Sequence, residues 1–306
     1  MIMNQDLYER IARKKKDLDS LRPLPKGALE MLRKQFAIEL AYNSNAIEGN
    51  TLTLRETKLV IEEGITIRGK PLREHFEAIN HQKAFEFLEA VIKSRECSVL
   101  SEDIIKGIHK IIMAGIDDEY AGRYRNVNVR ILGAVKSPPR FEKVPGKMEE
   151  FVKYAKENPD SMNEVEMAAA IHYKLVEIHP FTDGNGRCAR LLMNLFLMCR
   201  GYPVVMVLKV DRKKYYHCLR EADKGNLKPF TDFMGRNVER SLDLYLDAFR
   251  KGEEYVSLAE AVKDSPYSQE YLSLLARKGR LEALKLGRNW LVKRESIREY
   301  IKSKKK

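Results

Sequence analysis

The stretch His179-Pro-Phe-Thr-Asp-Gly-Asn-Gly-Arg-Cys-Ala-Arg190 decides how the centre of this chain folds, because it sets an unusual group of residues between two apolar-periodic segments. Its two glycines stand where a helix should begin, so backbone N–H groups and the positive end of a helix dipole can face an anion. Arg187 and Arg190 are three residues apart and share one helix face. Asp183 suits Mg²⁺, and His179 can accept a proton near neutral pH. The stretch predicts an enzyme site for a polyphosphate.

Taken singly, the parts of this stretch have simpler interpretations. A His-Pro pair often ends a helix, Gly-Asn-Gly often forms a turn, and helical arginines often face solvent. In combination they match every defining position of the pattern His-x-Phe-x-Asp/Glu-Gly-Asn-Gly-Arg-x-x-Arg. On these residues the chain resembles the Fic family, in which Phe181 would be an apolar residue that orients the loop.

The resemblance implies an enzyme that transfers AMP from ATP to a Ser, Thr or Tyr hydroxyl of a target protein and releases pyrophosphate. His179 would deprotonate the hydroxyl, and Asp183 would hold Mg²⁺ between the α- and β-phosphates. The other implied nucleotide contacts are an anion hole of Gly184, Asn185 and Gly186, with Arg187 at the β-phosphate and Arg190 at the γ-phosphate. In such a displacement at phosphorus the protein contributes mainly positioning and charge neutralisation.

A second motif, Ser44-Asn-Ala-Ile-Glu48-Gly49-Asn50, follows an apolar-periodic segment. By itself it is typical of a helix that ends at a glycine. Beside the first motif it resembles the inhibitory motif Ser/Thr-x-x-x-Glu-Gly/Asn of Fic proteins, defined here by Ser44, Glu48 and Gly49. The resemblance implies that Glu48 pairs with Arg190 in place of the γ-phosphate, so that a carboxylate and a phosphate compete for one guanidinium.

Residues 122–131 change to an alternating pattern, in which Val127, Val129 and Ile131 are separated by polar residues. The alternation predicts a half-buried strand, with residues 141–144 returning as its partner. The expected β-hairpin resembles the Fic flap, whose edge would align a target segment by strand addition. The flap residues would be Ile131, Leu132, Gly133 and Ala134.

Residues 213–226 are similar to the part of the family that surrounds the adenine base. Tyr215 would form a wall for the base, and ordinary core packing of Tyr215 and Tyr216 is the alternative. Asp223 stands where many relatives have Asn, so this contact stays open.

Helical periodicity dominates the rest of the chain. Apolar residues recur at helical spacing on both sides of the first motif, as Met167, Ile171, Leu175 and Ile178, and as Leu192, Leu195, Phe196 and Cys199. We therefore expect an all-α fold: a Fic-type helical core with the β-hairpin flap, and a small C-terminal winged-helix domain. The expected divisions are an N-terminal helical region at 1–95 with the inhibitory motif at 44–49, a catalytic core at 96–250, and the C-terminal domain at 251–306.

The segment 251–306 contains fourteen Lys/Arg and eight Asp/Glu, which is half of the net charge of +12. Helices would begin at Ser257 and Ser268, and two short apolar runs flank residues 287–289 as in a tight hairpin. This order of helix, helix, hairpin and helix resembles the winged helices of excisionase-type DNA-binding domains. The predicted DNA contacts are Arg277, Lys278 and Arg288. Dimerisation or target docking is the alternative role.

The 306 residues are enough for a large core and two domains. The four cysteines include no Cys-x-x-Cys pair, so neither a disulfide framework nor a zinc site is expected. No apolar run reaches the length of a membrane-spanning helix, and the first residues lack a signal-peptide core. We expect a cytoplasmic protein with no membrane partner.

Three functions remain under consideration. The leading one is a Mg²⁺-dependent protein adenylyltransferase that uses ATP and is held inactive by Glu48. The reverse reaction, removal of AMP with Glu48 aligning a water, would use the same site. The third is a DNA-binding regulator whose Fic domain acts on or senses a partner. The sequence names no target, and a homodimer is compatible with each function.

Overall fold

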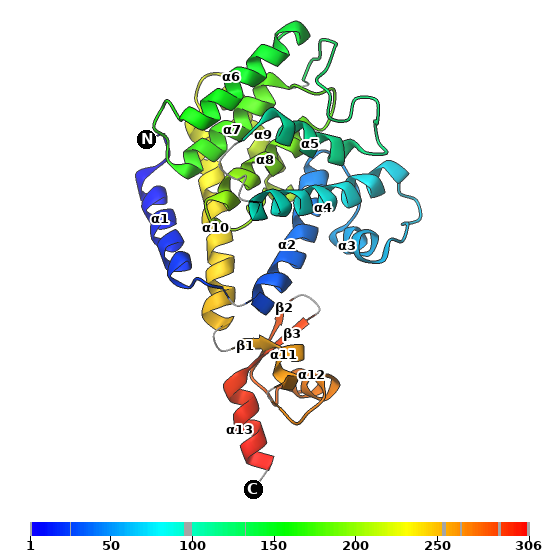
Figure 1. The fold of residues 1–306 in the computed structure, drawn as a ribbon, viewed down its shortest axis with the longest axis vertical. Helices are drawn as coiled ribbons and strands as arrows, with labels where there is room; N and C mark the ends of the chain where they lie inside the picture. Colours follow the sequence, from blue (N-terminus) through cyan, green and yellow to red (C-terminus); the bar gives the residue numbers. More distant parts are fainter. Residues whose placement is uncertain are drawn as a thin grey trace. The chain divides into compact units, whose positions relative to one another are not determined.

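The computed structural model describes residues 2–24, 26–94, 100–131, 133–252, 255–263, 265–286 and 289–304. Its chain forms two compact units, one of Met1–Lys15 and Ala37–Leu242 and the other of Lys16–Phe36 and Asp243–Lys306. Figure 1 labels the elements of both units.

The first unit is helical, and its described residues contain no strand. Three helices, α1 (Gln5–Ser20), α2 (Lys26–Ile47) and α10 (Lys228–Gly252), have residues in both units. The other helices of the first unit are α3 (Leu54–Glu63), α4 (Leu72–Lys93), α5 (Glu102–Met113), α6 (Val144–Glu157), α7 (Glu164–Ile178), α8 (Asn185–Cys199) and α9 (Arg212–Asp223), with short 3₁₀ turns η2 (Phe141–Lys143) and η3 (Lys209–Asp211).

Helices α7 and α8 form the centre of this unit, and α8 also packs against α4 and α5 (Figure 1). The apolar stripe predicted on α7 is buried, as are Leu192, Leu195 and Phe196 on α8. Asn163 caps α7 by accepting hydrogen bonds from two backbone N–H groups. The helix ends at His179, and Gly184, with a φ of 76°, precedes α8. Two buried helices thus hold the loop between residues 179 and 184.

The predicted β-hairpin flap is wrong, because the described residues between 122 and 144 form no strand. Side chains form hydrogen bonds with backbone groups that would pair between the two strands of a hairpin. Arg125 donates to the carbonyls of Val127 and Pro139, and Asn128 accepts from the N–H of Phe141. Val127 is 50% exposed, so the alternating pattern does not bury one face. Ile131, Gly133 and Ala134 lie in irregular structure, and Leu132 lies outside the described residues.

The second unit contains the predicted C-terminal helices and strands. Ser257 caps α11 (Leu258–Lys263) and Ser268 caps α12 (Gln269–Arg277), as expected. Strands β2 (Ala283–Leu286) and β3 (Asn289–Lys293) pair in antiparallel register, and α13 (Arg294–Lys304) follows. An unpredicted strand, β1 (Tyr255–Ser257), pairs with β3 to give the sheet order β1-β3-β2. Buried Leu272, Leu275, Val292 and Ile297 belong to the core of this C-terminal part.

Two further observations concern the cysteines and the membrane. Cys199 is disulfide-bonded, whereas Cys188 and Cys218 are free thiols. A single bridge needs only proximity in the fold, so the spacing of the cysteines gave no signal for it. Among the described helices, none has the length and apolar character that a bilayer crossing requires.

Candidate active site

His179 ends α7 in the left-handed region, with a φ of 51°. Its Nδ1 lies 3.2 Å from the carbonyl oxygen of Val176. A carbonyl can only accept, so in this hydrogen bond Nδ1 carries the proton and Nε2 keeps its lone pair. Burial lowers the pKa of His179 below 6.5, with the Arg125 charge acting in the same direction. The side chain is therefore a neutral base at physiological pH.

Arg125 holds the backbone around His179. Its guanidinium is buried and donates to three backbone carbonyls, with the bond from Nε to the His179 oxygen at 2.8 Å and that from Nη1 to the Val127 oxygen at 2.9 Å. The third carbonyl belongs to Pro139. No described carboxylate forms an ion pair with this guanidinium. Sequence reasoning missed Arg125, which lies in the segment taken for a strand.

The start of α8 approaches an anion closely because of its glycines. A Cβ on Gly186 would clash with Oε1 of Glu48, so only glycine lets this carboxylate reach the helix N-terminus. At Gly184 the positive φ favours glycine in the same way. The Asn185 side chain accepts from the N–H of Phe181 and donates to the Phe181 carbonyl, at 3.0 and 2.9 Å. Asn185 thus closes the loop through its side chain.

His109 on α5 supports this loop through a ring contact and a hydrogen bond. Its ring stacks on the buried ring of Phe181, with centroids 3.6 Å apart. Nδ1 accepts from the N–H of Gly122, so Nε2 carries the proton that it donates to the Asp183 carbonyl at 3.0 Å. Burial lowers the pKa of His109 to about 4. The sequence contains a signal for this residue, because His109 lies on the apolar face of a helix with Ile105 and Met113.

Arg190 and Glu48 form the ion pair that the second motif predicts. Nη2 of Arg190 lies 2.7 Å from Oε1 of Glu48, and the guanidinium also donates to the Ser44 hydroxyl and carbonyl at 2.9 and 2.8 Å. The Arg190 side chain is 2% exposed. Burial lowers the pKa of Arg190, but the Glu48 carboxylate outweighs this and raises it above the ordinary value. Gly49, with a φ of 110°, turns the chain directly after Glu48.

Arg187 and Asp183 belong to a second set of ion pairs. Arg187 is buried, with Nη1 3.2 Å from Oε1 of Glu77 and Nη2 3.5 Å from Oδ2 of Asp183. Arg73 on α4 contacts both carboxylates, Glu77 and Asp183. Glu77 also accepts from Asn50, the residue that follows the inhibitory motif, at 2.9 Å. Glu77 and Arg73 were not predicted, because their partners lie far away in sequence.

Asp183 has the chemistry of a Mg²⁺ ligand. Burial raises its pKa, yet Arg187, the Gly184 N–H and Arg73 outweigh burial and hold the pKa below 3.8. Its side chain is 47% exposed. In the described part of the chain, no three His, Cys, Asp or Glu side chains gather as a metal site. An ionised carboxylate fits Mg²⁺ that keeps waters and shares phosphate oxygens with a nucleotide.

Tyr215 is 1% exposed and packs behind Arg190. Its hydroxyl lies 3.1 Å from Nε2 of His172 and 3.4 Å from Nη1 of Arg190. This position favours the packing interpretation, and a role at the base stays a prediction. The neighbouring Tyr216 donates to Oε2 of Glu48 at 3.4 Å. Asp223 accepts from the N–H of Val135 at 3.0 Å and so anchors the segment after Gly133.

The predicted C-terminal contacts are placed only in part. Arg277 is the last residue of α12 and Lys278 follows it, whereas Arg288 lies outside the described residues. In the first unit, by contrast, the contacts of Glu48 with Arg190 and Gly186 join the two motifs.

Known proteins are similar to this chain in sequence and in fold. A family model described as Fic/DOC matches residues 99–197. A curated relative from Nematostella vectensis, named "Protein adenylyltransferase Fic", is 38% identical over 247 residues, which are 80% of this chain and 56% of the relative. The chain spans about half the length of the curated relatives it matches.

Solved structures agree with the family model. Fic-1 from C. elegans is 33% identical with a TM-score of 0.71, over 80% of this chain and 71% of that one. A Fic domain containing signaling protein from Bacteroides thetaiotaomicron is 30% identical with a TM-score of 0.72, over 79% of this chain and 97% of that one.

Proposed function

Because this chain belongs to the Fic/DOC family, we propose that it is a protein adenylyltransferase, which transfers AMP from ATP to a hydroxyl side chain of a target protein. One observation carries the proposal: the Glu48 carboxylate lies at the N-terminus of α8, against Gly186 and Arg190, and the loop that leads into this helix begins with the neutral His179. A helix N-terminus beside a buried arginine is a site for an anion, and in this state Glu48 is that anion.

The reaction needs one base and one bound triphosphate. Nε2 of His179, with its lone pair available, takes the proton of the target Ser, Thr or Tyr hydroxyl. The hydroxyl oxygen bonds to the α-phosphorus while the bond from that phosphorus to the bridging oxygen breaks, and pyrophosphate leaves. The N-terminus of α8 with Gly184 and Gly186, together with Arg187 and Arg190, stabilises the charge on the phosphates. Asp183 would hold Mg²⁺, which when bound neutralises phosphate charge.

Glu48 keeps this site inactive. While its carboxylate pairs with Arg190, the γ-phosphate has no guanidinium to bind, and ATP binds without the productive alignment. A single hydrogen-bonded charge pair is replaced by another, so the exchange costs little once Glu48 withdraws.

Labelling with ATP tests the proposal. Protein with Glu48→Gly, mixed with α-labelled ATP, Mg²⁺ and a lysate, should label itself or a lysate protein at least about tenfold more strongly than the unaltered chain. The double variant Glu48→Gly, His179→Ala should remove the labelling. Equal labelling of the single and the double variant would exclude His179 as the base and reject the proposal.

The reverse reaction uses the same residues, and the place of Glu48 at the helix N-terminus supports it as a second activity. There Glu48 would align a water for attack on an AMP-modified hydroxyl. A target modified by the Glu48→Gly protein is the substrate that separates the two directions. Release of AMP by the unaltered chain, and none by Glu48→Gln, is the expected result.

For the C-terminal part, the order of elements and the basic charge support a winged helix that binds DNA through Arg277 and Lys278. The exposed Tyr271 and Leu274 on α12, each 39% exposed, suit the alternative of a protein contact. Salt-dependent DNA binding by the full chain, lost in Arg277→Glu, Lys278→Glu, is the test. No change on that double substitution would favour the protein contact. The cytoplasmic location and the homodimer stay predictions.

A further inference from the structure

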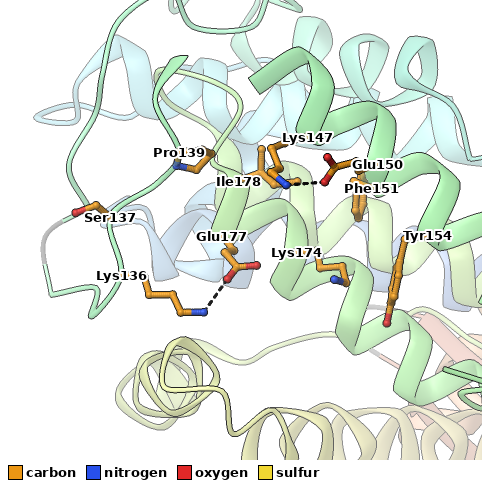
Figure 2. Close-up of a pocket in the computed structure, with 10 residues that line it drawn as sticks. All are labelled: Lys136, Ser137, Pro139, Lys147, Glu150, Phe151, Tyr154, Lys174, Glu177 and Ile178. Carbon is orange, nitrogen blue, oxygen red and sulfur yellow. Dashed lines mark hydrogen bonds and ion pairs between the residues drawn. The ribbon is translucent and has the colours of Figure 1, made fainter. Parts of the chain in front are cut away.

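A pocket of about 490 Å³ lies between the segment at 136–139 and the helices α6 and α7. Figure 2 shows the segment on one side and the side chains of both helices on the other. The pocket is lined by Lys136, Ser137, Pro139, Lys147, Glu150, Phe151, Tyr154, Lys174, Glu177 and Ile178.

The wall of this pocket is linked to His179 through the chain and through Arg125. Ile178 lines the pocket and is the residue before His179 in the chain. The opposite wall includes Pro139, whose carbonyl is bound by Arg125, and the same guanidinium binds the carbonyl of His179. The backbone of His179 and the pocket wall at Pro139 are therefore both held by the Arg125 guanidinium. The shared Arg125 anchor is the feature that connects this pocket to the backbone of the base.

The charges in the pocket leave one cation unbalanced. Glu177 is paired with Lys136 at 3.1 Å and Glu150 with Lys147 at 2.6 Å. Lys174 instead lies with its ammonium 4.0 Å from the centre of the Tyr154 ring (Figure 2). No described carboxylate pairs with Lys174. A cation over an aromatic face keeps N–H donors for a second partner.

The pocket also has an apolar side. Phe151 and Ile178 are 2% and 8% exposed, and Pro139 stands across from them. An apolar side chain can be buried here while a neighbouring carboxylate reaches the lysine.

We propose that this pocket docks the target polypeptide, and that it takes an acidic residue beside an apolar residue near the hydroxyl that is modified. This inference rests on the proposed transferase function and names the chemistry of its substrate. It replaces the strand addition expected from the sequence, for which the described flap residues provide no strand.

Synthetic peptides test the proposal in the Glu48→Gly background. Each peptide carries one Thr and either a Glu-Leu or a Lys-Leu pair, placed from about one to six residues away because an extended chain advances about 3.3 Å per residue. We expect one spacing at which AMP transfer to the Glu-Leu peptide exceeds that to the Lys-Leu peptide about fivefold in kcat/KM. Lys174→Glu should reverse this preference for the Glu-Leu peptide. Lys147→Glu, at an exposed residue that also lines the pocket, should weaken the preference.

Lys153→Glu is the matched control, because Lys153 is an exposed lysine of α6 that does not line the pocket. It should leave the preference unchanged. Labelling of the chain itself or of a lysate protein separates the two proposals: the absence of both in the Glu48→Gly background rejects the transferase function. Such labelling without any peptide preference, or with a preference that Lys174→Glu does not alter, overturns the docking site. Thermal unfolding verifies that each variant is folded.

Discussion

Arg190 and Arg125 are two buried arginines of one site, but their guanidinium groups are satisfied by different partners. Arg190 pairs with the Glu48 carboxylate at 2.7 Å, whereas Arg125 donates to backbone carbonyls, including that of His179 at 2.8 Å. Glu48 raises the pKa of Arg190 against the effect of burial, and burial lowers the pKa of Arg125. A phosphate can replace a carboxylate, but nothing in the reaction replaces a carbonyl of the chain. The first arginine is therefore exchangeable and the second is a fixed support.

Removal of Arg125, the fixed support, should have the largest effect on stability and on the labelling rate. Arg125→Ala leaves three backbone carbonyls without their donor, at about 1 kcal/mol each, so the free energy of unfolding should fall by about 3 kcal/mol. His179 also loses its anchor, and a displaced catalytic group costs about a hundredfold in rate. Urea unfolding and labelling in the Glu48→Gly background measure the two effects.

Arg130→Ala is the control for this substitution, because Arg130 lies in the same segment and is exposed. Its stability and labelling rate should stay near those of the parent. If Arg125→Ala labels at the parent's rate, Arg125 does not position the base and the comparison with Arg190 fails.

A nucleotide bound at Arg190, the exchangeable arginine, should stabilise a variant that lacks the Glu48 carboxylate. Glu48→Gln leaves the Arg190 charge without a carboxylate, and because Glu48 is 32% exposed the loss of stability should be only about 1–2 kcal/mol. A saturating triphosphate should restore the lost stability, since a ligand at a hundred times its Kd adds about 2.7 kcal/mol to the free energy of unfolding. Thermal shifts with and without ATP, beside the control Glu62→Gln on α3, measure this. A variant that ATP stabilises no more than the unaltered chain would contradict the exchange.

The same contrast explains how much the sequence could predict. The two motifs and the apolar stripes of α7 and α8 were predicted because residues close in sequence form each pattern. Arg125 and His109 were missed because their partners are 54 and 74 residues away. The flap prediction failed because side chains bind backbone groups of the segment: Arg125 binds the Pro139 carbonyl, and Asp223, 88 residues further along the chain, binds the Val135 N–H. The local alternation of residues contains no signal for such contacts.

Arg73 extends the comparison to an exposed guanidinium. It contacts Asp183, the proposed Mg²⁺ ligand, with exposed fractions of 55% and 47% for the two side chains. Exposed pairs contribute at most about 1 kcal/mol, so Arg73→Ala should raise the affinity for Mn²⁺, used as a probe for Mg²⁺, by no more than about fivefold. Titration calorimetry in the presence of ADP measures this, with Arg68→Ala as the control. Weaker Mn²⁺ binding would instead make Arg73 a nucleotide contact.

The smallest effect should be on the pH dependence of His179, where the Arg125 charge and the Glu48 charge act in opposite directions. Burial lowers the pKa of His179 most, Arg125 lowers it further, and Glu48 raises it. The base is neutral above its pKa, so the acid limb of kcat/KM should lie below pH 6.5. Glu48→Gln removes the charge that raises the pKa and should move the limb to lower pH, while Glu62→Gln should not. An acid limb that moves to higher pH in Glu48→Gln would mean that the removed carboxylate had not stabilised the imidazolium, and the electrostatic link between the exchangeable pair and the base would be rejected.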